Sequence, residues 1–389
     1  MIAATCGADS MSSSFNTLVH DGDNFLIGDG SLRIAMTTTA LTARFKRMGW
    51  PLALSFWISG MPAAVAAPFA YVANTRDKTL SVIDVATHAV VGDPIMVGLS
   101  PTDIAINPAG TRVYVANVDE DSISVIDTAS NTVSTTITNV QAHYFAMNPS
   151  GSRLFVAGDY FVVVIDTATN AQVGSPIAIV TADKPNCPKV NGKMAYDPTT
   201  ERLYVPARDC SGPINTPGIL SIVDLRNGTA VANVAVGALP TSATRNADST
   251  RIYVTNGWDS SISVVDAANV AETQTIAIGS LSFPANAVID PSGAHVYVTN
   301  SSGGFVTLIS TIDGSVGGSI AVAGGSYGIA MTSDGARLYI TNSFYDSVSV
   351  IDTATGTVEQ MSISVGRNPI AIAITRSDLL FANGFEQPK

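Results

Sequence analysis

Six aspartates occupy the same place in six of seven repeats, the sixth having Ser310 instead, and they are the first residues that suggest chemistry. They are Asp84, Asp127, Asp166, Asp224, Asp266 and Asp352. Carboxylates that converged in a ring would form an acidic centre able to bind cations or move protons. Each of them, however, is followed by a turn, where an Asp side chain accepts hydrogen bonds from backbone N–H groups two residues further on. Because they recur once per repeat, they lie on separate units, and we interpret them as turn-forming.

Histidine is the second residue type that could do chemistry. Beyond residue 67 there are three, His88, His143 and His295. We place His143 on the face opposite the other two, so no three-histidine metal site is predicted. A lone histidine more often has a structural role, held by hydrogen bonds, than a role as a catalytic base. The sequence contains no Cys-x-x-Cys-His, His-Glu-x-x-His, Gly-x-Ser-x-Gly or Walker-type motif, so we predict no cofactor, no metal site and no catalytic residues.

Aromatic and charged residues in loops form the third group, and they suggest recognition. Exposed aromatics beside charges, in loops on a rigid scaffold, are typical of binding surfaces. The alternative is ordinary packing of loop aromatics over the strands below. We predict a binding surface that contains Arg76, Tyr160, Arg208, Trp258, Tyr345 and Arg367. Aromatics beside arginine can also stack on nucleobases, which keeps single-stranded nucleic acid open as a ligand.

A repeat positions all of these residues. One phrase returns seven times: an apolar pair ending in an aromatic, a small residue, Asn, and then a Ser-Val-Ile-Asp-like run. The aromatics are Tyr71, Tyr114, Phe155, Tyr204, Tyr253, Tyr297 and Tyr339, spaced 41 to 49 residues apart. A repeat of this length is typical of solenoids and propellers. Residues shared by all copies, including the repeated Asn, are expected to build the scaffold.

Each repeat contains four β-rich segments. In the second copy they are residues 102–106, 112–116, 122–127 and 132–138, separated by turn residues and without a helical period. The chain after the leader begins with a second strand, residues 69–73, and the missing first strand appears as residues 369–374. Joining the two within one blade removes an exposed edge. The prediction is an all-β, seven-bladed β-propeller with four antiparallel strands per blade, closed by the C-terminal strand.

The repeated tetrapeptide carries a family resemblance. Residues 253–256 and 297–300 read Tyr-Val-Thr-Asn, and residues 339–342 read Tyr-Ile-Thr-Asn. From residue 69 to about 383 the chain resembles the YVTN-family β-propeller repeat proteins, although the third and fourth copies depart from the phrase. That family contains bacterial periplasmic and archaeal surface proteins, mostly without an assigned activity, and some members are linked to DNA binding. Nearby propeller families include lactonases and haem-bearing nitrite reductase domains.

The first 67 residues are predicted to lie outside the propeller. Residues 44–67 combine a basic start, an apolar stretch and an Ala-Val-Ala site, which is typical of a secretory signal. With Met36 as the true start, residues 1–35 are a leader of doubtful reality and residues 36–67 the signal peptide. The propeller then spans residues 68–383, followed by a tail, 384–389. Cleavage after Ala66 would leave no transmembrane anchor and a periplasmic or secreted bacterial protein.

Removing residues 1–67 leaves the net charge unchanged and removes one of the three cysteines. The net charge is −11, and it stays −11 without the leader, which holds four basic and four acidic residues. Such acidity disfavours a broad phosphate-binding surface but not a local basic patch. Cys187 and Cys210 remain after the leader, in two inserted loops of the fourth blade. An even pair in an exported protein predicts a disulfide between them, and two unpaired thiols are the alternative.

These observations predict an exported, monomeric, non-catalytic recognition propeller of the bacterial cell envelope. Its partner would be an envelope protein or a small ligand, bound through the loop face that carries the cysteine insertions. Three alternatives stay open. They are a lactonase-like hydrolase using His143 with Arg208 or Arg367 near the channel mouth, a nucleic-acid-binding protein, and a structural protein of the surface-layer type.

Overall fold

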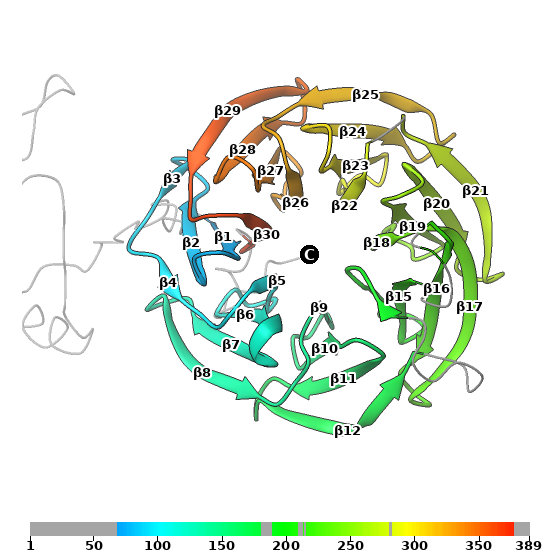
Figure 1. The fold of residues 1–389 in the computed structure, drawn as a ribbon, viewed down its shortest axis with the longest axis horizontal. Coiled ribbons are helices and arrows are strands. Elements are labelled where there is room, and N and C mark those ends of the chain that lie inside the picture. The colour runs from blue at the N-terminus through cyan, green and yellow to red at the C-terminus, as the bar shows by residue number, and fades with distance from the viewer. Residues whose placement is uncertain (1–67, 180–188, 209–212, 214, 280–281, 377–389) are drawn as a thin grey trace, which may run out of the picture. The chain divides into compact units, whose positions relative to one another are not determined.

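Seven antiparallel sheets make up the part of the chain that the computed structural model describes, residues 68–179, 189–208, 213, 215–279 and 282–376. All of it belongs to the unit Ala64–Lys389. Figure 1 shows the sheets arranged radially, each with its first strand toward the axis and its fourth strand outside. The predicted all-β, seven-bladed propeller is confirmed.

The strands of the first four blades are these. Blade 1 contains β30 (Pro369–Ile374), β1 (Phe69–Asn74), β2 (Thr79–Asp84) and an outer strand in two pieces, β3 (Ala89–Val90) and β4 (Ile95–Met96). Blade 2 contains β5 (Pro101–Ile106), β6 (Arg112–Asn117), the 3₁₀ turn η1 (Val118–Glu120), β7 (Ser122–Asp127) and β8 (Thr132–Thr138). Blade 3 contains β9 (Tyr144–Met147), β10 (Arg153–Ala157), β11 (Phe161–Asp166) and β12 (Ala171–Ala178). Blade 4 contains a divided first strand, β13 (Lys189–Val190) and β14 (Ala195–Asp197), with β15 (Arg202–Arg208), β16 (Pro217–Asp224) and β17 (Thr229–Ala238).

The remaining three blades are regular. Blade 5 contains β18 (Pro240–Arg245), β19 (Arg251–Asn256), β20 (Ser261–Asp266) and β21 (Ala271–Ala277). Blade 6 contains β22 (Pro284–Ile289), β23 (His295–Asn300), β24 (Phe305–Ser310) and β25 (Val316–Ala321). Blade 7 contains β26 (Ser326–Met331), β27 (Arg337–Asn342), β28 (Ser347–Asp352) and β29 (Thr357–Ser364). The four strands expected for the second repeat match β5 to β8 to within one residue at each end.

The repeated aromatics form the core between blades. Tyr114 of β6 is fully buried and packs with Phe145 and Leu154 of the next blade. Tyr71 of β1 also reaches the next blade, where its hydroxyl donates to Asn131 Oδ1 at 2.8 Å. Because each blade buries an apolar face only against its neighbour, the ring is stable as a whole rather than blade by blade.

The repeated polar residues are structural, as predicted. The Asn74 amide donates to Ser81 Oγ at 2.9 Å within its own blade. Gly366 lies against that amide so closely that an added Cβ would be 2.6 Å from Asn74 Cγ. In the turns, Asp84 Oδ1 accepts hydrogen bonds from the N–H groups of Ala86 and Thr87 at 2.8 and 3.0 Å. The repeated aspartates therefore cap separate turns and do not converge.

Strand β30 closes the ring. It pairs antiparallel with β1, placing Ile372 opposite Val72. The Phe69 N–H adds a hydrogen bond of 2.8 Å to Thr375 Oγ1. This confirms the closure predicted from the two chain ends. Strand directions also define one end of the ring, here called the loop face, which carries the loops between second and third strands and the loops entering first strands.

Several predictions fall on residues that the structure does not describe. The leader (1–35), the signal peptide (36–67), the Cys187–Cys210 pair and the tail (384–389) lie outside the described residues. No helix among the described residues is long and apolar enough to cross a membrane.

Candidate functional site

The six predicted binding residues occupy three separate places on the loop face. Blades 7 and 1 carry Tyr345 in the β27–β28 loop, Arg76 in the β1–β2 loop and Arg367 in the β29–β30 loop. Blades 3 and 4 carry Tyr160 in the β10–β11 loop and Arg208 at the end of β15. Blade 5 carries Trp258 in the β19–β20 loop. Five of the six residues lie in loops and Arg208 lies at the end of a strand, and together they do not form one surface.

Carboxylates hold the loop between blades 7 and 1 on both sides. Asp77 Oδ1 accepts from Arg367 Nε, and Asp77 Oδ2 accepts from the Arg367 N–H, each at 2.6 Å. Asp346 Oδ1 accepts from the Asn368 N–H at 2.8 Å. The hydrogen bonds from Arg367 hold the pKa of Asp77 below its usual value, so the carboxylate stays ionised. The β29–β30 loop is thus fixed to the loops of both neighbouring blades.

Two exposed aromatics lie beside this fixed loop. Phe344 and Tyr345 are 73% and 66% exposed. Their rings rest on glycine backbone, since a Cβ on Gly325 would lie 2.8 Å from Phe344 Cγ and one on Gly324 would lie 3.1 Å from Tyr345 Cε2. Large side chains are rarely left in water without a function when several gather in one place.

Three basic side chains lie in the loops next to Phe344 and Tyr345. Arg76, Lys78 and Arg367 are exposed. Among the described residues, no hydrogen bond or ion pair is recorded for the Arg76 or Lys78 side chain, whereas Arg367 is paired with Asp77. We call Phe344, Tyr345, Arg76, Lys78 and Arg367 the seam patch. It combines apolar anchors with unneutralised positive charge on an otherwise acidic protein.

His143 belongs to a different cluster, between blades 3 and 4. Its Nδ1 lies 3.5 Å from Asp159 Oδ1, which also contacts Lys189 Nζ at 3.0 Å. Burial lowers the pKa of His143, and Asp159 opposes this only in part. Lys189 pairs in register with Arg208, and Asp159 precedes Tyr160, so these residues are neighbours. In the described part of the chain, no Ser or Thr hydroxyl is hydrogen-bonded to the His143 ring, and Arg367 lies across blade 2.

Trp258 stands apart from both clusters. It is 50% exposed, and its backbone N–H donates to the Ala238 carbonyl at 3.2 Å. The loop is further fixed by Asp259, which accepts from the Ala238 N–H. Blade 6 separates Trp258 from the seam patch.

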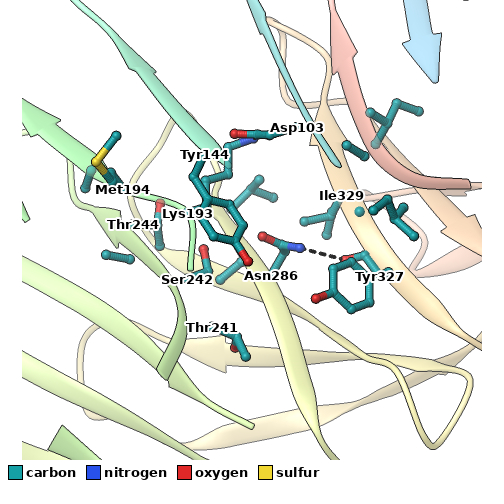
Figure 2. A pocket seen from close by; sticks show the side chains of 18 of the residues that line it. Asp103, Tyr144, Lys193, Met194, Thr241, Ser242, Thr244, Asn286, Tyr327 and Ile329 are labelled. Carbon is teal, nitrogen blue, oxygen red and sulfur yellow. Dashed lines mark hydrogen bonds and ion pairs between the residues drawn. The ribbon is translucent and has the colours of Figure 1, made fainter. Parts of the chain in front are cut away.

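Sequence reasoning missed a central cavity lined by the first strands (Figure 2). Its volume is about 290 Å³. Its polar lining includes Asp103, Tyr144, Lys193, Ser242, Asn286 and Tyr327, each from a different blade between blade 2 and blade 7. Pairing with the second strands shifts register just here, at Pro101–Asp103, Pro240–Ser242, Pro284–Ala287 and Ser326–Ile329. Such irregularities re-aim side chains and are common beside functional sites.

One ion pair anchors the cavity. Lys193 Nζ lies 3.3 Å from Asp103 Oδ1, and Asp103 Oδ2 accepts from the Phe145 N–H at 2.8 Å. The Asp103 side chain is 4% exposed, whereas that of Lys193 is 38% exposed. A buried carboxylate needs such partners, because an unpaired buried charge is costly. Aligning the first strands by position could have pointed to these residues, because the third residue is polar in β5, β18 and β22, namely Asp103, Ser242 and Asn286.

Two tyrosines face each other in the cavity. Figure 2 shows the hydroxyls of Tyr144 and Tyr327 directed toward its middle, with Asn286 between them. Asn286 Nδ2 donates to the Tyr327 carbonyl at 3.2 Å. Burial raises the pKa of both hydroxyls, and Tyr327 raises that of Tyr144 further, so both remain protonated donors. No group of three or more His, Cys, Asp or Glu residues able to hold a metal occurs within the described ranges.

Comparisons with known proteins agree with this architecture. The family model described as "YNCE-like beta-propeller" matches residues 50–377. No curated protein matches the sequence.

Solved structures with the same fold differ widely in function. A chain of the hydrazine synthase of Kuenenia stuttgartiensis superposes with a TM-score of 0.64 at 18% identity, covering 73% of this chain and 92% of that one. A functionally unknown protein from Desulfotomaculum acetoxidans gives 0.61 at 16% identity, covering 80% and 100%. A protein from Bacteroides uniformis described as a candidate 6-phosphogluconolactonase gives 0.61 at 16% identity, covering 79% and 99%. At these identities the similarity shows the fold alone.

Proposed function

The chain belongs to the YNCE-like β-propeller family, and we propose that it is an exported, monomeric and non-catalytic recognition module of the bacterial cell envelope. It binds its partner through the seam patch. The secretory pattern of residues 44–67 supports export to the periplasm or beyond.

The seam patch is the observation that carries this proposal. Exposed aromatics supply large contact area at little conformational cost, and arginine beside them adds directional hydrogen bonding. The loops are held by Asp77 and Asp346, so binding would cost little ordering of the backbone. The preferred partner is an envelope protein that presents an acidic group next to an apolar one, complementing Arg76 and Lys78.

The hydrolase alternative gains no support from this geometry. His143 is oriented by Asp159 and has Arg208 nearby, but no Ser or Thr hydroxyl is hydrogen-bonded to its ring among the described residues. Arg367, the other arginine expected to act with it, lies in blade 1 and is paired with Asp77. Nucleic acid would find aromatics and cations at the seam patch, yet the net charge of −11 opposes contacts beyond it. We therefore favour a protein partner.

The test is affinity capture from detergent-solubilised envelope, quantified by mass spectrometry. Wild type is compared with Arg76→Ala/Tyr345→Ala at the seam patch and with Trp258→Ala at blade 5. Ile312→Ala is the control, because Ile312 is 86% exposed in the β24–β25 turn at the other end of the ring. We expect a protein held by wild type, Trp258→Ala and Ile312→Ala, and lost from the seam variant. An identical set of proteins captured by all four would refute the proposal.

A further inference from the structure

The central cavity has hydrogen-bonding groups that the protein itself does not use. The Tyr327 hydroxyl and Asn286 Oδ1 have no hydrogen-bond partner among the described residues, and the Lys193 ammonium contacts Asp103 alone among them. Because these groups line open space, water or a ligand must satisfy them. They come from blades 4, 6 and 7 and point to one volume.

The six polar lining residues, Asp103, Tyr144, Lys193, Ser242, Asn286 and Tyr327, carry no net charge together. Asp103 and Lys193 cancel each other at 3.3 Å. Arg245 lies at the far end of its strand, where Nε donates to the Tyr196 carbonyl at 2.8 Å and Nη1 to Ser249 Oγ at 3.0 Å. No carboxylate pairs with Arg245 among the described residues, but these bonds hold its donors at that end of the lining. Beside Lys193 and Tyr327, a charged ligand would therefore lose its hydration without a free counter-charge next to it. The cavity favours a neutral ligand that both donates and accepts hydrogen bonds.

The size and lining of the cavity indicate which class of neutral ligand fits it. Two tyrosine rings form facing walls, while Ile370 and Ala371 supply an apolar side. The volume of about 290 Å³ lies just below the range for drug-sized ligand sites, roughly 300–1,000 Å³, so the cavity suits a smaller molecule. We propose that this cavity binds a neutral polyol of monosaccharide size, a function independent of the seam patch.

The residues have distinct roles in this site. Adjacent ligand hydroxyls accept from Lys193 Nζ and the Tyr327 hydroxyl, and donate to Asn286 Oδ1. Asp103 positions Lys193 rather than contacting the ligand through both oxygens, since its Oδ2 already accepts from the Phe145 N–H. Ligand enters from the loop face, because the polar residues lie near the start of their first strands, where the chain enters from that face.

Ligand-observed saturation-transfer NMR on the purified protein tests the proposal. The probes are D-glucose, D-galactose, D-mannose and D-xylose, with D-glucuronate and D-galacturonate as charged counterparts. We expect at least one neutral sugar to bind and its uronate to bind more weakly. Binding by no neutral sugar would show a water-filled channel and overturn the proposal, as would tighter binding of a uronate.

A hydroxyl deletion locates the site. Tyr327→Phe removes one donor from a desolvated site, so the sugar should bind about 3- to 10-fold more weakly. Tyr345→Phe makes the same change at the seam patch and should leave sugar binding unaltered. Unchanged affinity in Tyr327→Phe would place the sugar elsewhere and overturn the assignment. Because Tyr327→Phe should also leave envelope capture intact, failure of this site and failure of the seam patch are distinguishable.

Discussion

The hydroxyl of Tyr339 lies 2.8 Å from Nδ1 of His88, across the joint where the last blade meets the first. The same hydroxyl lies 3.1 Å from the Val85 carbonyl, to which it donates. His88 Nε2 in turn lies 3.7 Å from Glu359 Oε2, which also binds Arg337 at 2.7 Å. The joint is therefore held by polar contacts as well as by strand pairing, and His88 takes part in two of these contacts.

Removing the Tyr339 hydroxyl should destabilise the ring. Tyr339→Phe leaves the Val85 carbonyl without its donor, and we expect a loss of about 1–2 kcal/mol in the free energy of unfolding, measured by urea titration. Tyr114→Phe is the matched control, because the Tyr114 hydroxyl is buried without a hydrogen-bond partner in the described chain. That variant should be neutral or stabilising. Equal losses in the two variants would contradict the prediction.

Stability should fall as the pH drops below 6.5. Burial, helped by Arg337, lowers the pKa of His88 in the folded state from 6.5, although Glu359 opposes the shift. The unfolded chain therefore binds more protons, so the contribution of His88 is present above 6.5 and lost as pH falls. Burial lowers the pKa of His143 as well, with the same sign. Chemical denaturation at pH 7.5, 6.5 and 5.5 measures the trend.

His88→Gln separates the two histidines. Glutamine cannot take up the proton, so the variant should lose less stability than wild type between pH 7.5 and 5.5. If its pH dependence equals that of wild type, His88 does not contribute.

Closure of the ring should depend on the inner strand of blade 1. Ile372 in β30 is buried against Val72 and Tyr339. Ile372→Ala should cost about 2–5 kcal/mol, as for other buried aliphatic truncations, in guanidinium unfolding. Val173→Ala is the comparison, since Val173 is 50% exposed in β12 and its loss should change stability by less than about 0.5 kcal/mol. A cost at Ile372 as small as that at Val173 would mean that β30 is not integral to the ring.

The loop between blades 7 and 1 should loosen when its carboxylates are removed. Asp77→Ala deletes the acceptor of the Arg367 N–H, so that amide should exchange with deuterium about 3- to 10-fold faster. Asp346→Ala should accelerate Asn368 instead. Because exposed ion pairs contribute about 0–1 kcal/mol, global stability should hardly change. Hydrogen exchange followed by NMR reads both amides, and unaltered exchange at Arg367 in Asp77→Ala would count against a fixed loop.

The fold could be read from the sequence because its determinants are local and repeated. The Asn74 contact with Ser81 and the Asp84 turn lie within a few residues, and each recurs in other blades. Even the closing strand β30 was predictable, because a missing first strand at one end of the repeat array must be supplied by the other.

The sites could be predicted only in part. Tyr345 and Trp258 were expected in exposed loops, and their separation by one blade follows from the order of the repeats. The contacts that hold the β29–β30 loop to both neighbouring blades were not predictable, because they join loops from different blades. The Asp103–Lys193 pair joins residues far apart in sequence on non-adjacent blades, and no periodicity marks it. A local register shift in the first strands also decides which side chains reach the channel. Three of these shifts begin at a proline, but a proline does not by itself fix which of the following side chains turns inward.

The pairing of β1 with β30 has a consequence for how the protein is made. Blade 1 contains strands from both ends of the repeat array, so its inner strand is synthesised after all the other described strands. No nascent chain that stops short of residue 374 can complete the circle, and until then β1 presents an unpaired edge to whatever surrounds it. Completion of the ring is thereby postponed until β30 has been synthesised and has paired with β1.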